Sequence, residues 1–291
     1  MNTTLLPELA TNLLLVRNPG KHCNRQEYVP EHLLCHVVAG RLQLTEASGT
    51  HNFQAGSILL LRRNVLVKLE KYPAPDGTPF QAVFLLLPQA FLQAYALQHK
   101  VPAVVATATQ EAMRLLPEHP VLRGLFQSLG FYFDEKPGTQ PNEALIQLKQ
   151  AEAVLGILAQ DPALAGWLFD FAEPGKLDLA AFMHRHYIFN VPIARFAQMT
   201  GRSVSTFQRD FYKHFGLAPA AWLLQRRLEA AHAALLTPGK RTTDVYLEVG
   251  FEDVAHFSKS FKRTFGYNPS QAGQQFAARS SAGQASGAPF R

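Results

Sequence analysis

Apolar residues between positions 10 and 90 come in short runs that are separated by turn-forming residues. The clearest runs are VVAGRLQL (37–44), AGSILLLRRNVLVKLEKY (55–72) and QAVFLLLP (81–88). The segment between the last two, YPAPDGTPF (72–80), holds three prolines and one glycine, so it must be a loop. Several short strands with turn signals between them predict a β-barrel or a β-sandwich in this part of the chain.

From residue 89 onward the spacing of apolar residues becomes helical. It predicts helices over 90–98, 121–133 and, most clearly, 142–160. Asn142 is a good N-cap for the last of these helices, and the pair Asp161-Pro162 ends it.

The helix over 142–160 carries a leucine-rich stripe that is broader than one small barrel needs. We therefore expect part of it, with Leu148 and Leu155, to form a homodimer contact. Burial of the whole stripe in the core is the alternative. The stripe comprises Leu145, Leu148, Ala151, Val154, Leu155 and Leu158.

The C-terminal part contains an internal repeat with an offset of 50 residues. SVSTFQRDFYKHFGLAP (203–219) aligns with DVAHFSKSFKRTFGYNP (253–269). Each copy has an N-cap, then four apolar residues on one helix face, then a glycine where a helix ends in a left-handed residue. The N-caps are Ser203 and Asp253, and the matching pairs are Val204 and Val254, Phe207 and Phe257, Phe211 and Phe261, Phe215 and Phe265, Gly216 and Gly266, and Pro219 and Pro269.

Each copy predicts the second helix of a helix-turn-helix unit, because a short helix and a tight turn precede it. The preceding helices are predicted within PIARFAQMTG (192–201) and TDVYLEVGF (243–251). The face opposite the apolar one is polar and cationic, as docking in a DNA major groove requires. It presents Ser205, Thr206, Gln208, Arg209, Tyr212 and Lys213 in the first copy, and Ala255, His256, Ser258, Lys259, Lys262 and Arg263 in the second.

Between the two units, APAAWLLQRRLEAAHAALLT (218–237) predicts one helix of about 19 residues, roughly 28 Å long at ~1.5 Å per residue. Such a helix can hold two recognition helices near one DNA turn apart, which is ~34 Å. A single chain would then reach two successive major grooves on one face of the duplex. The residues expected to face inward are Trp222, Leu223, Leu228, Ala231 and Leu235.

The charge distribution favours a polyanionic partner for the C-terminal part alone. Residues 1–175 carry 13 Lys and Arg against 15 Asp and Glu, whereas residues 176–291 carry 15 against 7. No apolar run reaches the ~18 residues that cross a bilayer, and the N-terminus lacks the features of a signal peptide. We therefore expect a soluble, cytoplasmic protein with no membrane partner.

These motifs closely resemble the AraC/XylS family of bacterial transcription activators. The resemblance is carried by RRLEAAHAALLT (226–237) and VYLEVGFEDVAHFSKSFKRTFGYNPSQ (245–271), and it extends over about 176–275. It implies a seven-helix DNA-binding domain with two helix-turn-helix units joined by a linker helix. Tyr246 stands where the family usually has alanine and Thr242 where it usually has a branched apolar residue, which suggests looser packing in the second unit.

Carried over by position, the resemblance assigns base contacts to residues on both recognition helices. These are Ser205, Gln208 and Arg209 in the first and Ala255, His256, Ser258 and Lys259 in the second. Because Ala255 is small where a polar residue is common, we expect weaker base recognition by the second unit. Phosphate contacts are expected from Ser203, Thr206, Lys213, Lys262 and Arg263.

The strand-rich N-terminal part, followed by helices, resembles the cupin-like regulatory domain of the same family. GSILLLRRNVLV (56–67) and FLLLPQAFLQAYA (84–96) are most similar to the type III secretion activator ExsA and its relatives. In that subfamily this domain is associated with self-association and control by a protein partner, and other family members bind a sugar or another small molecule there. The resemblance thus implies double-stranded DNA, a second copy of the chain, RNA polymerase, and a small-molecule or protein effector as partners.

The predicted fold class is α+β, with a cupin-like β-barrel and helices at 1–170, an all-α domain with two helix-turn-helix units at 176–276, and a disordered tail at 277–291. The predicted function is that of a sequence-specific DNA-binding transcription regulator, more specifically an activator. One alternative is a cupin-type enzyme with an accessory basic domain. Another is an adaptor that kept the fold but lost DNA binding.

The sequence offers little for catalysis or metal binding. Enzymatic cupins place two histidines one residue apart, with a glutamate and a third histidine further on, and that spacing does not occur here. We therefore expect no metal, no cofactor and no catalytic residue. The residues considered for a metal site were His22, Cys23, Cys35, His36 and His51.

Two pairs of adjacent charged residues stand out in the N-terminal part. Asp134 and Glu135 are adjacent in a polar segment before a Pro-Gly pair, which favours a solvated turn over a catalytic pair. Arg62 and Arg63 interrupt an otherwise apolar strand. They indicate either a strand end that reaches solvent, or a site for an anionic ligand or an acidic partner surface.

Overall fold

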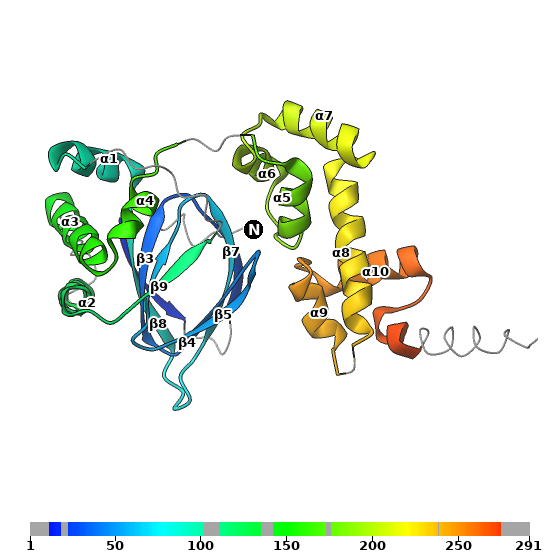
Figure 1. The fold of residues 1–291 in the computed structure, drawn as a ribbon. Coiled ribbons are helices and arrows are strands. Elements are labelled where there is room, and N and C mark those ends of the chain that lie inside the picture. Colours follow the sequence, from blue (N-terminus) through cyan, green and yellow to red (C-terminus); the bar gives the residue numbers. More distant parts are fainter. Residues whose placement is uncertain are drawn as a thin grey trace, which may run out of the picture. The chain divides into compact units, whose positions relative to one another are not determined.

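The computed structural model describes residues 12–18, 23–101, 111–134, 142–172, 176–237 and 239–274. The chain divides into two compact units, Met1–Glu173 and Pro174–Arg291, drawn in Figure 1. The tail predicted at 277–291 lies outside the described residues, as do Glu135 and the side chain of Asp134.

Two antiparallel sheets form the frame of the N-terminal unit. The five-stranded sheet has the order β1 (Leu13–Asn18), β8 (Phe80–Leu87), β3 (His32–Ala39), β6 (Ile58–Leu61) and β9 (Met113–Leu116). The four-stranded sheet has the order β2 (Cys23–Val29), β7 (Val65–Tyr72), β4 (Arg41–Glu46) and β5 (Gly49–Gln54).

The core between the two sheets follows from side-chain alternation along the strands. Leu33, Cys35 and Val37 of β3 face residues of the other sheet, such as Leu42 and Leu44 of β4, and all five are buried. The sequence prediction of a strand-rich barrel or sandwich is thus confirmed in its antiparallel, two-sheet form.

The run predicted at 37–44 divides into two strands at Gly40. Gly40 has φ +81°, and a Cβ there would lie 2.4 Å from the Tyr72 carbonyl oxygen. Only glycine avoids both the left-handed strain and that overlap. The apolar run at 55–72 also divides, because Asn64 takes a left-handed conformation (φ 59°) between β6 and β7.

The helices of this unit cover the outer face of the five-stranded sheet, as Figure 1 shows. Leu34, Leu60 and Leu85 from that face share a second core with the helical residues Leu122 and Val154. The helices are α1 (Gln89–Gln98), α2 (Pro120–Asp134), α3 (Glu143–Gln160), the single 3-10 turn η1 (Pro162–Leu164) and α4 (Ala165–Leu168). No helix in the described part of the chain is long and apolar enough to cross a membrane.

Helix α3 begins and ends where the sequence predicted. The Asn142 side chain accepts hydrogen bonds from the Ala144 and Leu145 amides, and the helix ends before Asp161. The leucine-rich stripe, however, is only partly buried. Val154 is in the core and Ala151 and Leu158 pack against it, whereas Leu145, Leu148 and Leu155 are exposed.

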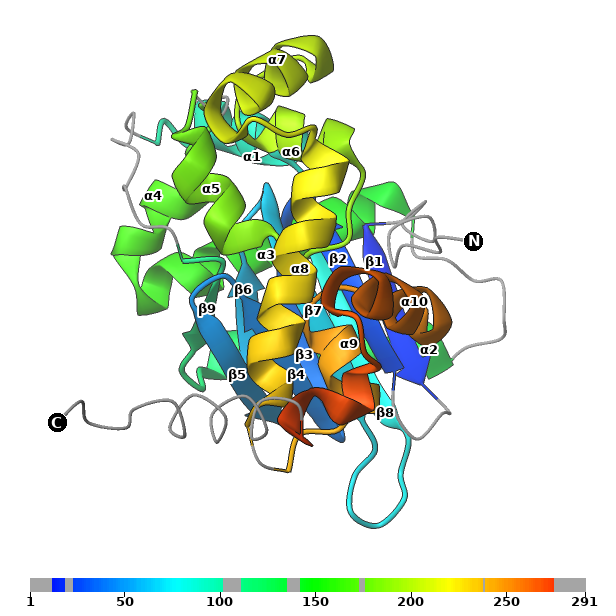
Figure 2. The same ribbon diagram turned by 90° about the vertical axis from the view of Figure 1, so that its right-hand side faces the viewer.

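Every regular element in the described part of the C-terminal unit is a helix. Its elements are α5 (Leu179–His186), α6 (Ile193–Met199), α7 (Val204–Phe215), α8 (Pro219–Leu235), α9 (Thr242–Glu248), α10 (Val254–Phe265) and the 3-10 turn η2 (Pro269–Gln271). Figures 1 and 2 agree in placing α7 at one end of the long helix α8 and α10 at its other end. This arrangement positions the candidate site.

Candidate DNA-binding interface

The first helix-turn-helix unit consists of α6, a short turn and α7. The Ser203 side chain accepts a hydrogen bond from the Thr206 amide and so begins α7, and Gly216 ends it in the left-handed conformation with φ 68°. Both caps are the ones that the repeat predicted.

The inner face of α7 packs on the start of α8. The ring centroids of Phe211 and Phe215 lie 5.6 Å and 4.7 Å from that of Trp222. Phe207 and Phe211 are fully buried. Val204, expected on the same apolar face, is exposed at the first turn, and Val254 is exposed at the matching place in α10. The buried part of each apolar face therefore begins at its first phenylalanine, Phe207 in α7 and Phe257 in α10, and not at the valine.

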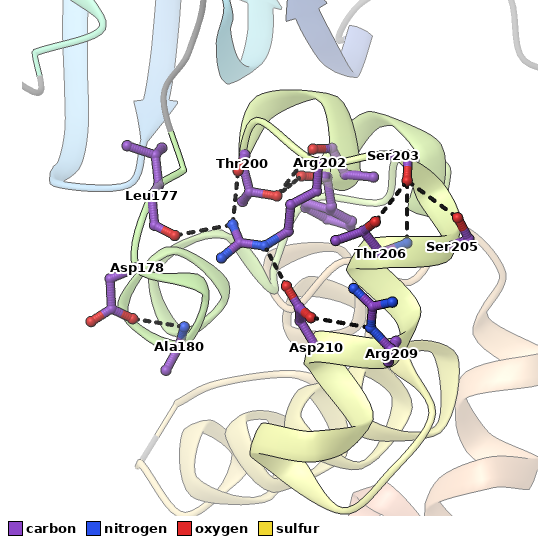
Figure 3. A network of polar contacts seen from close by, with 12 residues as sticks. Leu177, Asp178, Ala180, Thr200, Arg202, Ser203, Ser205, Thr206, Arg209 and Asp210 are labelled. Atoms are coloured by element: carbon purple, nitrogen blue, oxygen red, sulfur yellow. Dashed lines mark hydrogen bonds and ion pairs between the residues drawn. The ribbon is translucent and has the colours of Figure 1, made fainter.

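The outer face of α7 presents the side chains that the sequence proposed for DNA. Gln208 and Lys213 are exposed, and Arg209 is 77% exposed. Figure 3 shows Arg209 beside Asp210, with its Nε 3.7 Å from the Asp210 Oδ1. At this distance and exposure the pair is weak, so Arg209 keeps its hydrogen-bond donors for another acceptor.

Three hydroxyl groups cluster at the N-terminal end of α7. The Ser203 Oγ lies 3.2 Å from the Ser205 Oγ and donates to the Thr206 Oγ1 at 3.0 Å. Ser203 and Ser205 are exposed and Thr206 is half-buried. A helix N-terminus with exposed hydroxyl groups is suited to a phosphate group.

The second unit repeats this construction with α9 and α10. The Asp253 side chain accepts a hydrogen bond from the His256 amide at 2.5 Å, and Gly266 ends α10 with φ 86°. The exposed proposed contacts are Ala255, His256, Lys259, Lys262 and Arg263. Ser258 is half-buried, so it is the least accessible of the predicted base contacts in this unit.

Packing around α9 accommodates the two unusual residues of the second unit. Tyr246 packs against the cluster of Val245, Phe257 and Phe261, and its ring centroid lies 6.4 Å from that of Phe257. Thr242 begins α9 and is half-buried.

Helix α8 connects the units and is 17 residues long, or about 25 Å at ~1.5 Å per residue. The five residues expected to face inward are all buried: Trp222, Leu223, Leu228, Ala231 and Leu235. Arg227 is also buried, which the sequence interpretation missed. Its burial holds the pKa of Arg227 at about 10, so the side chain stays charged at neutral pH.

Two family models match the chain in separate parts. Residues 196–275 match a model described as a helix-turn-helix domain, and residues 32–165 match the ExsA N-terminal regulatory domain. The curated relatives include the virulence regulon transcriptional activator VirF of Yersinia enterocolitica, 26% identical over 81% of this chain and 86% of its own length. They also include the regulator ExsA of Pseudomonas aeruginosa, 25% identical over 82% of this chain and 84% of its own length.

The chain belongs to the AraC/XylS family of DNA-binding transcription regulators. A shorter match within the family is the transcriptional activator NphR of Rhodococcus, 40% identical over 28% of this chain and 24% of its own length. Among solved structures, an apo form of ToxT from Vibrio cholerae covers 90% of this chain and 96% of its own at 14% identity, with a TM-score of 0.42. At that score the structural likeness adds nothing to the family assignment.

In this AraC/XylS chain, the residues considered for a metal site do not converge. Cys35 and His36 are neighbours on β3 and face opposite sides of the sheet. Cys35 lies in the core between the sheets, and the His36 ring centroid lies 4.8 Å from that of Phe126 on α2. Among the described residues, no group of three or more His, Cys, Asp or Glu side chains is placed to hold a metal ion. His22 and the side chain of Cys23 lie outside the described residues.

Arg62 and Arg63 have an internal role that neither sequence interpretation foresaw. The Arg62 Nη2 donates to the Asp170 Oδ2 at 2.9 Å. The Arg63 Nη2 donates to the carbonyl oxygens of Asp170 and Ala172, at 2.8 Å and 3.0 Å, and its Nη1 donates to the Gln89 Oε1 at 2.9 Å. The two arginines thus hold the segment that follows α4.

Proposed function

We propose that this chain activates transcription by binding two successive major grooves of one DNA duplex, with α7 in one groove and α10 in the other. The observation that carries the proposal is the placement of both recognition helices on one supporting helix, α8. A helix of about 25 Å with a recognition helix packed at either end suits the ~34 Å repeat of the major groove.

Under this proposal, some side chains on the outer faces of α7 and α10 contact bases and others contact phosphates. Arg209 pairs with guanine through two hydrogen bonds, and Gln208 is suited to adenine. Phosphate contacts come from Ser203, Thr206, Lys213, Lys262 and Arg263, and the remaining base contacts come from Ser205, Ala255, His256, Ser258 and Lys259. The adaptor alternative leaves this exposed basic face without a role.

Activation as the direction of control is supported by the relatives VirF and NphR, whose descriptions call them transcriptional activators. RNA polymerase is accordingly a proposed partner. The match of residues 32–165 to a regulatory domain supports control through the N-terminal unit, by a small-molecule or protein effector. A regulator of this kind acts in the cytoplasm, where the bacterial chromosome lies.

We further propose that the chain forms a homodimer through α3. Leu148 and Leu155 are 66% and 58% exposed, and with Leu145 they give this helix an apolar outer stripe. Burial of such a stripe is worth about 25 cal/mol per Å² of apolar surface. None of the relatives named above is described as an enzyme, so they give no support to the alternative of a cupin-type enzyme.

In vitro selection from a randomised DNA library tests the proposed function. The full chain should enrich a two-part site whose halves are separated by about one helical turn, 10–10.5 base pairs. The matched control carries Arg209→Ala and Lys259→Ala, and it should enrich the site more weakly, with relaxed preference at the base pairs that these two side chains contact. Failure of the unaltered chain to enrich any sequence above the starting library would contradict the proposal.

A further inference from the structure

Arg227 joins the linker helix to the α5–α6 connection, the segment that leads into the first helix-turn-helix unit. It projects from α8 and is only 9% exposed. Its Nε donates to the Tyr187 carbonyl oxygen at 2.7 Å, its Nη2 donates to the Phe189 carbonyl oxygen at 2.8 Å, and its Nη1 donates to the Asn190 Oδ1 at 3.2 Å. All three acceptors lie on the connection between α5 and α6. The planar guanidinium fixes the direction of each bond, which a lysine cannot do.

Gly250 brings the second unit to the same place. It lies in the turn between α9 and α10 with φ +94°. A Cβ at this position would lie 2.2 Å from the Ile188 carbonyl oxygen and 3.1 Å from the Arg227 Nε. The turn of the second helix-turn-helix unit therefore packs directly against the α5–α6 connection, which leads into the first unit, and Arg227 of α8 lies beside both segments.

Apolar clusters flank Arg227 on both sides along α8. Phe211 and Phe215 pack on Trp222 at the start of α8, and Phe257 and Phe261 share a core with Leu228 and its neighbours towards the end of α8. Arg227 lies between these two apolar clusters. Glu252, in the second unit, attracts the buried guanidinium and partly offsets the cost of its burial. Loss of these bonds would leave buried carbonyl groups without a donor.

We propose that Arg227 and Gly250 set the relative placement of the two recognition helices, and so the spacing between the two DNA segments that the chain selects. The inference rests on the proposed two-groove binding. One base pair advances the duplex by ~3.4 Å and turns it by about 35°, given 10–10.5 base pairs per turn. Two units that are locked together cannot follow such a change, whereas loosened units can.

The test measures binding of the full chain to a series of duplexes that carry the selected site with one or two base pairs added or removed between its halves. The unaltered chain should lose at least about 10-fold in affinity for each one-base-pair change, the size of a mismatch penalty. Arg227→Lys keeps the positive charge but loses the planar guanidinium and its directed N–H donors. Its affinities for all the spacings should therefore lie within about 3-fold of one another.

A milder variant and a matched control accompany this measurement. Asn190→Ala removes one of the three acceptors and leaves the arginine in place, so it should show an intermediate loss of spacing discrimination. Arg241→Lys is the same substitution at an arginine whose bonds to Asp244 stay within one unit, and it should keep the discrimination of the unaltered chain.

The possible results separate the inference from the proposed function. If the unaltered chain selects no two-part site, the proposed function fails and the inference with it. If the unaltered chain discriminates sharply between spacings and both junction variants do so equally, the inference alone is overturned. The inference is also overturned if Arg227→Lys lowers the DNA affinity by the same factor at every spacing, because the arginine would then contribute only to the stability of the fold.

Discussion

The Arg202 Nε donates to the Asp210 Oδ2 at 3.2 Å and so joins the turn of the first helix-turn-helix unit to its recognition helix. Figure 3 shows that the same guanidinium also binds two carbonyl oxygens, those of Leu177 at 3.0 Å and Thr200 at 2.8 Å. The positions that match 202 and 210 in the second unit hold Glu252 and Ser260, so this brace belongs to the first unit.

Arg202→Ala should lower the free energy of unfolding of the C-terminal unit by about 1–3 kcal/mol, because its carboxylate and carbonyl partners lose a charged donor. Denaturant titration followed by the fluorescence of Trp222, in a Trp167→Phe background, measures the loss. Arg209→Ala is the control and should change the same free energy by less than about 0.5 kcal/mol, since that side chain is exposed. Equal effects of the two substitutions would contradict the brace.

Arg209 and Lys213 should differ in what they contribute to DNA binding. Arg209→Ala should cost about 1–3 kcal/mol at the selected site and relax the preference at one or two base pairs. Lys213→Ala should weaken binding to all sequences alike and make the salt dependence shallower by about one unit. Binding isotherms over a salt series, on the selected site and on unrelated DNA, measure both effects.

Lys259 provides the comparison for the second unit. A lysine ammonium is a point charge and lacks the planar set of N–H donors that an arginine guanidinium has. Ala255, one helical turn before Lys259, offers no hydrogen bond to a base. Lys259→Ala should therefore cost less specificity than Arg209→Ala in the same assay. Equal and purely nonspecific losses for both substitutions would show that the base-contacting face is misassigned.

The exposed leucines of α3 predict the oligomeric state. Leu148→Glu combined with Leu155→Glu should shift the full chain from dimer to monomer in sedimentation velocity, because two carboxylates would be buried without partners. Leu97→Glu is the control, since Leu97 is an exposed leucine on a different helix, α1. An unaltered chain that is already monomeric at high concentration would refute the dimer.

His32 predicts acid sensitivity of the N-terminal unit. Burial, reinforced by Arg63 and Arg62, lowers the pKa of His32 from 6.5 to about 3 in the folded chain. Below pH 6.5 the His32 imidazole therefore binds a proton in the unfolded chain but stays neutral in the folded chain. Above pH 6.5 this group does not affect the free energy of unfolding. Below pH 6.5 it lowers that free energy by up to about 1.4 kcal/mol per pH unit, until the pH reaches the pKa of His32 in the folded chain.

The substitution His32→Asn should remove this part of the pH dependence while keeping an acceptor for the Arg63 amide, which donates to the His32 Nδ1 at 3.4 Å. Between about pH 7.5 and 5.5 the unaltered chain should lose about 1.4 kcal/mol more than the variant. Trp167 fluorescence in a Trp222→Phe background follows the unfolding of this unit. Identical losses in both chains would rule out His32 as the source.

The helix-turn-helix units could be predicted because their signals are local. Ser203, Asp253, Gly216 and Gly266 act within one helical turn of their own positions, and the duplication repeats each signal. Arg227 could not be placed in the same way. Its acceptors lie about 40 residues earlier in the chain, so nothing near it indicates that a charged residue is buried.

In the N-terminal unit, too, the features that depend on distant residues could not be predicted from the sequence. Composition indicated strands in the run at 55–72, but the turn at Asn64 depends on one left-handed residue within a uniformly apolar run. Periodicity placed α3 and its N-cap correctly. The choice of which leucines face outward depends on the sheet and on α2, whose Leu122 occupies the space beside Gly156.

Hydroxyl-radical footprinting of one chain on its selected duplex tests the central claim most directly. The account predicts two protected segments on one face of the DNA, about 10–10.5 base pairs apart. Arg209→Ala should weaken only the segment that α7 occupies. A single protected segment per chain, or protection spread equally over both faces of the duplex, would contradict the claim that the two helix-turn-helix units bind successive major grooves.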